Sequence, residues 1–576
     1  MAITSNNKMT DNSDELSYND LFVQSMQLQI PVFQREYRWG QKQLTRMMEE
    51  IDFIIEGRDD SRFLGAIIAV KRNSNPSKPQ VFEIVDGQQR LTTLYLIVLA
   101  AAYTLAVNNH TEDAKGIINK YIYNDWYELG TNTKLLPSFK DRIQFKNILN
   151  KVIQVGDLQD RFQYRIKFPE TTGSSTGKMT AQFDGIKKLL IKEYKEAGYE
   201  RINDIVNIAI SKLTFIFILL KDASNATTVF HGLNDPGEPI GIGDLVRNEV
   251  FSYIYDDPDL AQSVYNETWE PFHRKLGEYY DKYFFPFGII FEPSIKNSDL
   301  FRGLRKIWGE ISSPTKIIDE LEKYTTPFLS ICSENAINSY DNEINKSLSR
   351  LRNSNSPTSI YPFVMRVLKE YEINKLDSKT TVEILKIIES FLVRRAICGI
   401  EPTGLLSVFR FMWKNLNGDI TASKIKEVIL SRATIDWPDD ERLKLAVLSR
   451  KIYGTSICKY AILEYDRSFD SDFPEGNDPW IEHVLPQTLN ASWKKIVSEE
   501  DHKLLSNTWG NLIPLSSKMN RELSQSLFEI KKPIIKSDSM YSSARRLAEE
   551  DDNWTAVEIR KRSNTIAKWA IQRWPK

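Results

Sequence analysis

The most apolar stretch of the chain runs from Leu91 to Val107 and follows directly on a segment with the composition of a β-strand. The strand segment is VFEIVDG (81–87), and QQRLTTLYLIVLAAAY (88–103) is typical of a helix that begins where the strand ends. The apolar stretch is short for a membrane span and contains three threonines and two tyrosines. It therefore predicts a helix buried inside a mixed α/β domain, with no membrane partner.

The pattern changes along the 576 residues, a length that predicts several domains. FLGAIIAV (63–70) and LTFIFILL (213–220) are further β-type runs. From about 256 to 470, apolar residues recur at three- and four-residue spacing, which predicts helices. We expect an α+β multidomain protein with these parts: a disordered tail at 1–15, a mixed α/β domain at 16–255, a helical connector at 256–400 and a largely helical domain at 401–576.

Composition places few limits on the partners. The net charge is −1, from 76 basic and 77 acidic residues, so a nucleic-acid site would need a local basic surface. The three cysteines form no CxxC pair, which argues against a structural zinc site and against a disulfide framework. The polar N-terminal segment lacks the pattern of a signal peptide, and we expect a cytoplasmic protein.

The C-terminal region carries a pattern typical of a nuclease. WIEHVLPQ (480–487) and GNLIPL (510–515) each contain a short β-type run, and SSKMNRELSQSLFEIKK (516–532) predicts one helix opened by a serine cap. Strand, strand and helix in this order form the ββα-metal motif of HNH nucleases. The chain resembles that family at Glu482, His483, Asn511 and Asn520.

The chemistry of phosphodiester hydrolysis explains these residue types. A neutral histidine can take a proton from water, and a divalent ion can neutralise the phosphate. The resemblance implies that His483 is the general base and that Asn511 orients it or braces the intervening loop. It also implies that Glu482 and Asn520 hold Mg²⁺ or Mn²⁺ through oxygen. The lysines and arginine expected to add positive charge for DNA phosphates are Lys518, Arg521, Lys531 and Lys532.

Two conditions apply to this nuclease site. Neighbouring residues of a strand point to opposite faces, so Glu482 and His483 can share a site only if the strand ends or bends there. A lone histidine is more often an ordinary buried residue than a base, and here the surrounding pattern favours catalysis. His502, which is flanked by acidic residues on an expected exposed helix, is a weaker candidate.

Two N-terminal segments stand out, IPVFQREYRWG (30–40) and VDGQQRLTTL (85–94). The second is a strand-to-helix junction in which Gly87 permits a tight turn, and the free N–H groups at a helix start favour an anion. Arg90 adds a forked donor suited to phosphate, while Gln88 and Gln89 could read a base or a sugar. The alternative is a purely structural helix cap in which Asp86 accepts local N–H bonds.

These two segments, together with ATTVFHGLNDPGEPIGIGDLVRNEVF (226–251), resemble the N-terminal domain of the GmrSD family of type IV, modification-dependent restriction enzymes. The resemblance implies a ParB/sulfiredoxin-like domain that binds or hydrolyses GTP, ATP or UTP. It also places the HNH core at about 475–535. The residues expected at the nucleotide are Gln34, Arg35, Asp86, Gln88, Gln89, Arg90 and Thr92.

The combined expectation is an anti-phage endonuclease. It would nick or cleave modified double-stranded phage DNA, with a modified cytosine or a phosphorothioate linkage as the mark, under control of the nucleotide. A homodimer is compatible with this expectation. Two alternatives stay open: a nucleotide-gated sensor of DNA modification whose nuclease module is inactive, and an RNase.

Overall fold

The fold is described from a computed structural model of the 576-residue chain. The residues that the structure describes are 10–23, 26–31, 34–71, 80–123, 132–155, 158–162, 174–220, 241–254, 257–309, 311, 313–333, 339–469 and 479–576. The chain divides into two compact units, of which the first is Met1–Lys275 with Trp308–Ile318, and the second is Leu276–Ile307 with Asp319–Lys576.

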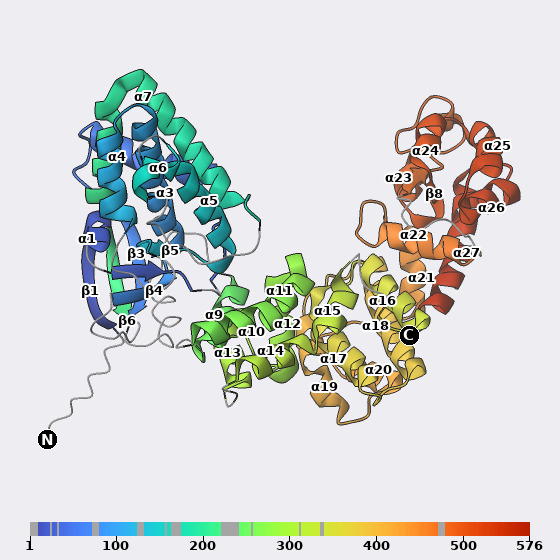
Figure 1. Ribbon diagram of the computed structural model, residues 1–576. Coiled ribbons are helices and arrows are strands. Elements are labelled where there is room, and N and C mark those ends of the chain that lie inside the picture. Colours follow the sequence, from blue (N-terminus) through green and yellow to red (C-terminus); the bar gives the residue numbers. More distant parts are fainter. Residues whose placement is uncertain are drawn as a thin grey trace. The chain divides into compact units, whose positions relative to one another are not determined.

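The first unit contains a mixed six-stranded sheet and helices that cover it (Figure 1). Its strands are β1 (Thr10–Ser17), β2 (Met26–Gln29), β3 (Arg62–Lys71), β4 (Gln80–Asp86), β5 (Leu135–Leu136) and β6 (Leu213–Leu220). Its helices are α1 (Tyr18–Val23), α2 (Gln41–Ile55), α3 (Gln88–Val107), α4 (Thr111–Ile117), α5 (Arg142–Ile153), α6 (Leu158–Phe162), α7 (Lys178–Ser211), α9 (Ile242–Ser252), α10 (Pro258–Val264) and α11 (Glu270–Leu276).

The strand order is β1-β6-β3-β4-β2-β5. β1 pairs antiparallel with β6 and β3 pairs antiparallel with β4, whereas the β3–β6, β4–β2 and β2–β5 pairs are parallel. Side chains alternate across the sheet: Ile67 of β3 belongs to the main core, and Ile68 belongs to a small cluster on the other face. The sheet therefore has one face that packs on the main helical core and a second, smaller apolar cluster.

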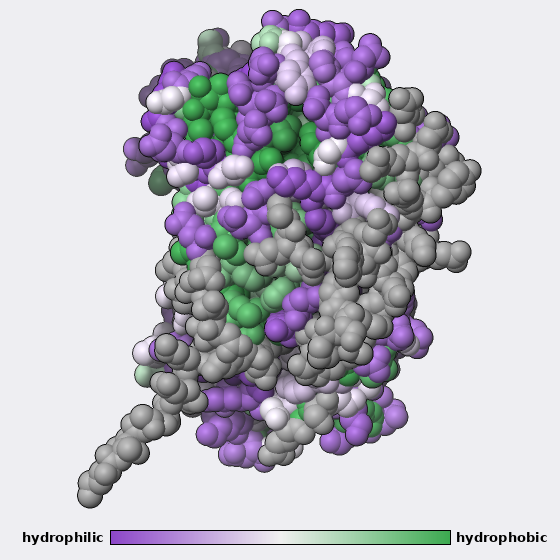
Figure 2. All heavy atoms as spheres, turned by 60° about the vertical axis from the view of Figure 1, so that its left-hand side comes forward, coloured by the Kyte–Doolittle hydropathy of each residue, from purple (hydrophilic) through white to green (hydrophobic). Residues whose placement is uncertain are grey.

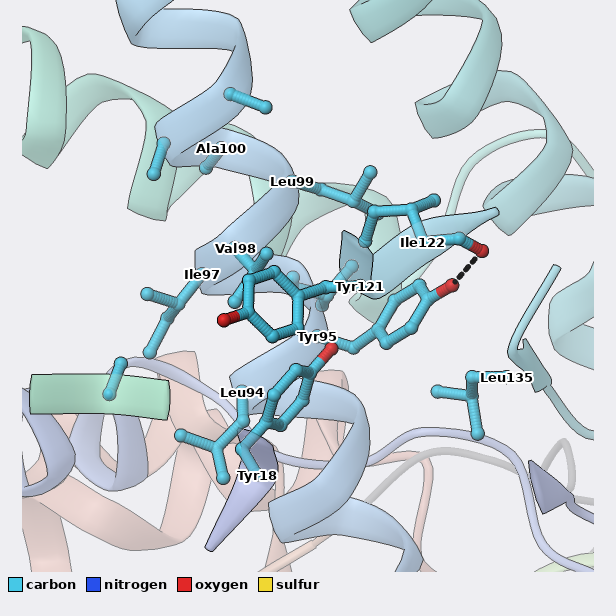
Figure 3. Close-up of a cluster of buried hydrophobic side chains, with 14 of the residues drawn as sticks. Tyr18, Leu94, Tyr95, Ile97, Val98, Leu99, Ala100, Tyr121, Ile122 and Leu135 are labelled. Carbon is cyan, nitrogen blue, oxygen red and sulfur yellow. Dashed lines mark hydrogen bonds between the residues drawn. The ribbon is translucent and has the colours of Figure 1, made fainter. Parts of the chain in front are cut away.

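Helix α3 forms the centre of the main core. It lies among α4, α5 and α7 (Figure 1) and contacts all three. Its side chains are buried nearly all round. Tyr95 donates its hydroxyl to the carbonyl of Ile122 at 3.0 Å and lies beside Tyr18 (Figure 3). Among the described helices, α3 is the one long and apolar enough to cross a membrane, and its burial identifies it as a core helix. The outer face in Figure 2 is, by contrast, hydrophilic over most of its described surface.

The sequence predicted these elements well, with one error at the N-terminus. The expected strands and the expected helix correspond to β3, β4, β6 and α3. The predicted disordered tail at 1–15 is wrong from residue 10 onward, because Thr10–Ser17 forms β1 on the edge of the sheet. The residues before Thr10 lie outside the described part. β1 is polar and has few β-forming residues, so its strand conformation depends on the pairing that β6 offers.

The second unit is largely helical. Its helices up to Arg467 are α12 (Tyr280–Phe291), α13 (Leu300–Ile307), α14 (Pro314–Glu322, which begins within the segment assigned to the first unit), α15 (Thr325–Cys332), α16 (Asn342–Asn353), α17 (Tyr361–Glu372), α18 (Ser378–Ile397), α19 (Leu405–Leu416), α20 (Ala422–Leu430), α21 (Asp440–Ser449) and α22 (Cys458–Arg467). The C-terminal elements are β7 (Trp480–His483), α23 (Glu499–Leu505), β8 (Leu512–Leu515), α24 (Ser517–Leu523), α25 (Phe528–Asp538), α26 (Ser542–Glu550) and α27 (Ala556–Arg573).

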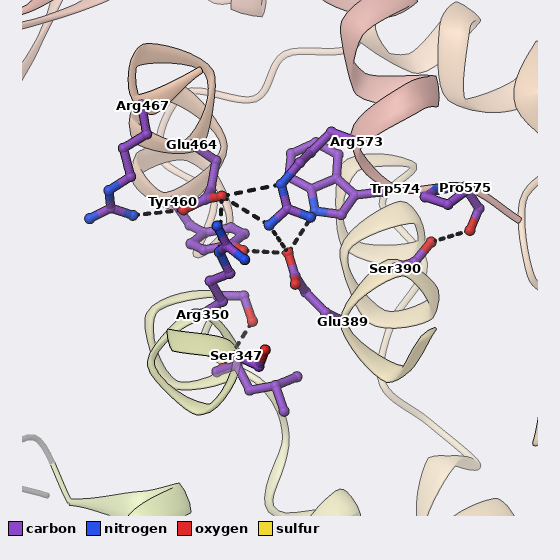
Figure 4. Close-up of polar contacts among 12 residues, drawn as sticks. Ser347, Arg350, Glu389, Ser390, Tyr460, Glu464, Arg467, Arg573, Trp574 and Pro575 are labelled. Carbon is purple, nitrogen blue, oxygen red and sulfur yellow. Dashed lines mark hydrogen bonds and ion pairs between the residues drawn. The ribbon is translucent and has the colours of Figure 1, made fainter. Parts of the chain in front are cut away.

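A polar network connects the end of the last helix, α27, with α18 and α22 (Figure 4). Oε1 of Glu389 on α18 accepts hydrogen bonds from the Tyr460 hydroxyl at 2.7 Å, from Arg573 at 2.6 Å and from the Trp574 indole at 2.8 Å. Arg573 also pairs with Glu464 on α22 at 2.9 Å. Buried charges need such partners, so these contacts fix the end of α27 on α18 and α22.

The predicted strand–strand–helix unit is present near the C-terminus. β7 and β8 pair antiparallel, His483 opposite Leu512, and α24 packs on β7. The Ser516 hydroxyl caps α24 by accepting from the Met519 amide at 3.2 Å. The prediction of one helix over 516–532 is wrong, because Ser524 adopts a positive φ of 40° and separates α24 from α25.

Candidate nuclease centre and N-terminal signature

His483 is the last residue of β7, so the strand ends where the site requires it. Its Nε2 lies 3.0 Å from Oδ1 of Asn507, and the ring packs edge-on against Tyr453 with 4.3 Å between centroids. Gln487 donates its amide to the same Asn507 oxygen at 3.1 Å, which marks that oxygen as an acceptor. Nε2 of His483 therefore carries the hydrogen, and Nδ1 is left unprotonated.

Burial sets the protonation state of this histidine. It lowers the pKa of His483 to about 4, and the positive charge of Lys531 acts in the same direction, while the bond to Asn507 acts against both. The ring is neutral at physiological pH and can accept a proton at Nδ1. A phosphate placed beside it would raise its pKa, since a nearby negative charge favours the protonated ring.

Asn511 braces the loop that follows β7 and does not contact His483. Its side chain is fully buried and makes four hydrogen bonds. The amide donates to the carbonyls of Leu485 at 2.8 Å and Ser506 at 2.7 Å. Oδ1 accepts from the Leu485 amide at 2.8 Å and from the Trp554 indole at 2.9 Å. Of the two roles expected for Asn511, the structure shows the brace; the orienting contact to His483 comes from Asn507.

Glu482 precedes His483 and forms a buried ion pair with Lys531 of α25. The two atoms, Oε1 and Nζ, are 2.6 Å apart. Nζ also donates to the carbonyls of His483 at 3.1 Å and Val484 at 3.3 Å. Burial raises the pKa of the Glu482 carboxyl and lowers that of the Lys531 ammonium, and the attraction between them opposes both shifts.

The second residue expected to hold a metal is Asn520 on α24, the helix that packs on β7. Its Oδ1 is buried and has no hydrogen-bond partner in the structure. Leaving a buried acceptor unpaired costs about 1–3 kcal/mol, so this oxygen is open to a ligand that would pair with it. Oxygen donors from one carboxylate and one amide fit Mg²⁺ or Mn²⁺, ions that retain water and substrate oxygens.

The basic residues expected at DNA differ in exposure. Lys531 has a side chain that is 0% exposed and bonds three protein oxygens, so the prediction that it contacts DNA is wrong. Lys532 pairs with Asp552 at 2.6 Å. Lys518 is 84% exposed on α24, and Arg521 is exposed one turn later. His502 is half-buried and contacts the Pro486 carbonyl at 2.8 Å, so it lies less open than the sequence indicated.

In the first unit, glutamines join the two signature segments. Oε1 of Gln89 accepts from the backbone amides of Arg38 at 2.8 Å and Trp39 at 3.3 Å, and its amide donates to the Glu36 carbonyl at 3.3 Å. Gln34 donates to the Val85 carbonyl at 3.2 Å. These glutamine side chains thus bond protein atoms and hold the segments together.

The remaining residues of the second signature also have structural contacts. Gln88 donates to Gln34 at 3.4 Å, Arg90 donates to the Ala66 carbonyl at 2.6 Å, and Thr92 is buried. Asp86 is the last residue of β4. Gly87 has a φ of +88°, and a Cβ there would lie 2.8 Å from Ile67, so the turn requires glycine. Val32, Phe33 and residues 226–240 of the signature segments lie outside the described residues.

Arg35 meets helix α9 at a shared carboxylate. Its Nη1 lies 3.6 Å from Asp244, and Nη2 of the buried Arg247 lies 2.8 Å from the other oxygen of Asp244. Nη2 of Arg247 is close enough to Asp244 for an ion pair, but neither Nη2 nor Nε has the geometry of a hydrogen bond to a protein atom. Two guanidinium groups thus share one carboxylate, with hydrogen-bonding capacity left over on the buried one.

Sequence reasoning missed Asn507, Tyr453 and Arg247. Asn507 and Tyr453 belong to no motif of the pattern; their nearness to His483 arises because the Ile452 amide bonds the Asn507 carbonyl at 3.0 Å. Arg247 lies in DLVRN (244–248), beside the polar Asn248 and Glu249, so the sequence carries no signal that distinguishes it from a surface arginine.

The fold defines a protein with an α/β N-terminal domain and a ββα unit near the C-terminus. Two family models match the chain: the GmrSD restriction endonuclease N-terminal domain over residues 18–251, and the GmrSD restriction endonuclease C-terminal domain over residues 437–569. The chain belongs to the GmrSD family of restriction endonucleases. No curated protein matches the chain. Family membership supports a nuclease that acts in defence and has DNA as its partner.

Proposed function

We propose that the C-terminal module is a metal-dependent HNH-type endonuclease that nicks or cleaves modified foreign double-stranded DNA, with His483 as its general base. The observation that carries this proposal is the pair of contacts at Asn507. Because Asn507 accepts from both Gln487 and Nε2 of His483, the histidine is held in the tautomer that leaves Nδ1 free to take a proton.

The step assigned to His483 is the activation of water. Nδ1 takes a proton as the water oxygen forms a bond to phosphorus; the bond from phosphorus to the leaving oxygen breaks, and that oxygen takes a proton from solvent. The edge-on ring of Tyr453 and the bond to Asn507 restrict rotation of the imidazole, so that the base is already oriented when DNA binds.

Glu482 and Asn520 would hold Mg²⁺ or Mn²⁺. The unpartnered Oδ1 of Asn520 supports this assignment, together with the carboxylate at the strand end. Such an ion supplies charge neutralisation for the phosphate. Lys518 and Arg521, exposed on α24, would contact the DNA backbone.

The first unit would bind a nucleoside triphosphate, GTP, ATP or UTP, that controls cutting. Since Gln34 and Gln89 bond protein backbone, the groups best placed for phosphate are Arg35 and the incompletely hydrogen-bonded Arg247. The modification on the target would be a modified cytosine or a phosphorothioate linkage. A homodimer in the cytoplasm is compatible with this function.

A cleavage assay tests the nuclease assignment. Supercoiled plasmid DNA, modified and unmodified, is incubated with Mg²⁺ or Mn²⁺ and with each nucleotide, beside structured and single-stranded RNA. We expect nicking of modified DNA that His483→Ala abolishes. His110→Ala, which changes a half-buried histidine of the first unit, should keep the activity. Unchanged cutting by His483→Ala would show that His483 is not the general base. Cutting of RNA alone would favour an RNase. Absence of both cutting and metal binding would favour a sensor with an inactive nuclease module.

A binding assay tests the nucleotide half separately. We expect a fluorescent GTP or ATP analogue to bind the full chain and to lose at least tenfold in affinity in Arg35→Ala. Lys42→Ala, which removes an exposed positive charge at the start of α2, serves as the control. Equal affinity in wild type and Arg35→Ala would exclude Arg35 from the nucleotide site.

A further inference from the structure

The contacts of Lys531 saturate its ammonium group. A protonated lysine has three N–H donors, and Nζ of Lys531 has three acceptors: Oε1 of Glu482 at 2.6 Å and the carbonyls of His483 at 3.1 Å and Val484 at 3.3 Å. All three acceptors belong to the end of β7 and the residue that follows it. The lysine itself lies on α25, a separate helix.

Burying this charge is unfavourable unless its partners are in place. A lysine on α25 could extend to solvent, as an exposed lysine normally does, yet this one is 0% exposed. Its neighbour Lys532 has the ordinary arrangement and pairs with the exposed Asp552. The position of Lys531 is therefore specific to the carboxylate of Glu482, the one charged residue among the proposed metal ligands.

The ammonium has two consequences for any cation at this site. It occupies Oε1 of Glu482 and leaves Oε2 as the oxygen that can face an ion. It also cancels the charge of the carboxylate, so that a divalent ion meets a pair with no net charge and a nearby positive group. In the low-dielectric interior both effects are larger than they would be at the surface.

We propose that Lys531 is a built-in counter-cation of the nuclease centre that keeps divalent-metal affinity low until DNA phosphate adds negative charge. This inference rests on the proposed function, because it takes Glu482 as a metal ligand. The negative charge that Lys531 removes from the free site is returned by the substrate. Metal binding is thereby coupled to DNA binding, and the free protein has little tendency to hold an activated metal centre.

The test measures Mn²⁺ binding by electron paramagnetic resonance of free Mn²⁺, with the full chain at pH 8 and no DNA. Lys531→Met keeps most of the side-chain volume and removes the charge, and Lys532→Met is the matched control. We expect Lys531→Met to bind Mn²⁺ at least tenfold more tightly than wild type, and Lys532→Met to bind as wild type does. Unchanged or weaker affinity in a folded Lys531→Met protein would overturn the proposal; Lys531→Gln replaces it if the methionine variant does not fold.

A second measurement needs no change at Lys531. In a His483→Ala background, which leaves the DNA intact, an oligonucleotide duplex should raise Mn²⁺ affinity at least tenfold. Equal affinity with and without the duplex contradicts the coupling, even if neither Lys531 variant folds. Should cleavage depend on His483 while both Mn²⁺ comparisons fail, this inference alone is lost. Should His483→Ala cut DNA as wild type does, His483 is not the base, and the DNA-free comparison of Lys531→Met with wild type still tests this inference.

Discussion

Replacing Asn511 by alanine tests whether this residue contributes to the stability of the nuclease centre or to its catalytic rate. The side chain makes four hydrogen bonds, to both backbone groups of Leu485, to the Ser506 carbonyl and to the Trp554 indole. Alanine removes all four bonds and leaves their partner groups unpaired inside a fully buried region. Water has no ready access to the groups left behind, so each of them loses a bond without a replacement.

The magnitude follows from these bonds. At about 1 kcal/mol net for each of four buried hydrogen bonds, Asn511→Ala should lose about 4 kcal/mol of unfolding free energy. For a unit of about 290 residues, whose unfolding entropy is about 2.1 cal/mol/K per residue, that loss corresponds to a fall in Tm of about 7 °C. Asn511→Asp should lose at least as much, because a carboxylate would face the two carbonyls that the amide now serves.

The assay combines thermal unfolding, followed by far-ultraviolet circular dichroism, with nicking measured well below the lowered transition. We expect Asn511→Ala to recover most of its cutting at low temperature. Asn507→Ala, which removes the partner of His483 Nε2 at a half-buried position, should unfold within about 1 kcal/mol of wild type yet cut about 10- to 100-fold more slowly at all temperatures. A Tm for Asn511→Ala within 2 °C of wild type would refute the brace.

Three other predictions concern separate parts of the molecule. Glu389→Ala leaves the buried Tyr460 hydroxyl and Trp574 indole without an acceptor and removes one of the two carboxylates that pair with Arg573, so it should cost about 3–5 kcal/mol in urea unfolding. Glu343→Ala at an exposed ion pair should cost less than about 1 kcal/mol, and equal losses would contradict a stabilising role for the Glu389 network. Burial raises the pKa of Asp141 to about 6, so the folded chain binds a proton that the unfolded chain releases, and stability should fall by up to about 3 kcal/mol as pH rises from about 4 to 6. Asp141→Asn should lack this fall. If the unfolding free energies of wild type and Asp141→Asn change with pH in the same way, Asp141 is not the group that titrates. Asn520→Ala should weaken Mn²⁺ binding at least tenfold and leave Tm unchanged or higher, because its Oδ1 has no protein partner to lose; retained affinity would remove it from the metal site.

Short sequence patterns predicted the strands and helices that are determined by their own residues. The runs that became β3, β4 and β6 are rich in β-branched and aromatic residues, and α3 begins at the glycine that its turn requires. β1 has a polar sequence and becomes a strand through pairing with the distant β6, a cause that no short window contains. The break at Ser524 is of the same kind, since serine carries no strong signal for a positive φ.

The nuclease pattern showed which residues matter, and the structure separates what they do. Lys531 and Lys532 are adjacent in sequence, yet one is buried against Glu482 and the other pairs with the exposed Asp552. One step along a helix turns a side chain by about 100°, so only the packing of α25 decides which lysine faces the site. The sequence therefore indicated positive charge on α25, but it could not show which of the two lysines is buried and which is exposed.

Hydrogen-bond saturation gives a physical criterion for dividing the signature residues. Asn511 and Gln89 use their amide groups on protein atoms, whereas Oδ1 of Asn520 and two nitrogens of Arg247 are buried without such bonds. A saturated residue acts through the fold, so its loss appears as lower stability and is relieved by cooling. An unsaturated buried residue already carries a desolvation cost of about 1–3 kcal/mol that a ligand would offset. Its loss should therefore reduce ligand affinity at every temperature without destabilising the chain, which makes stability and affinity, measured on the same variant, the way to tell a brace from a binding residue.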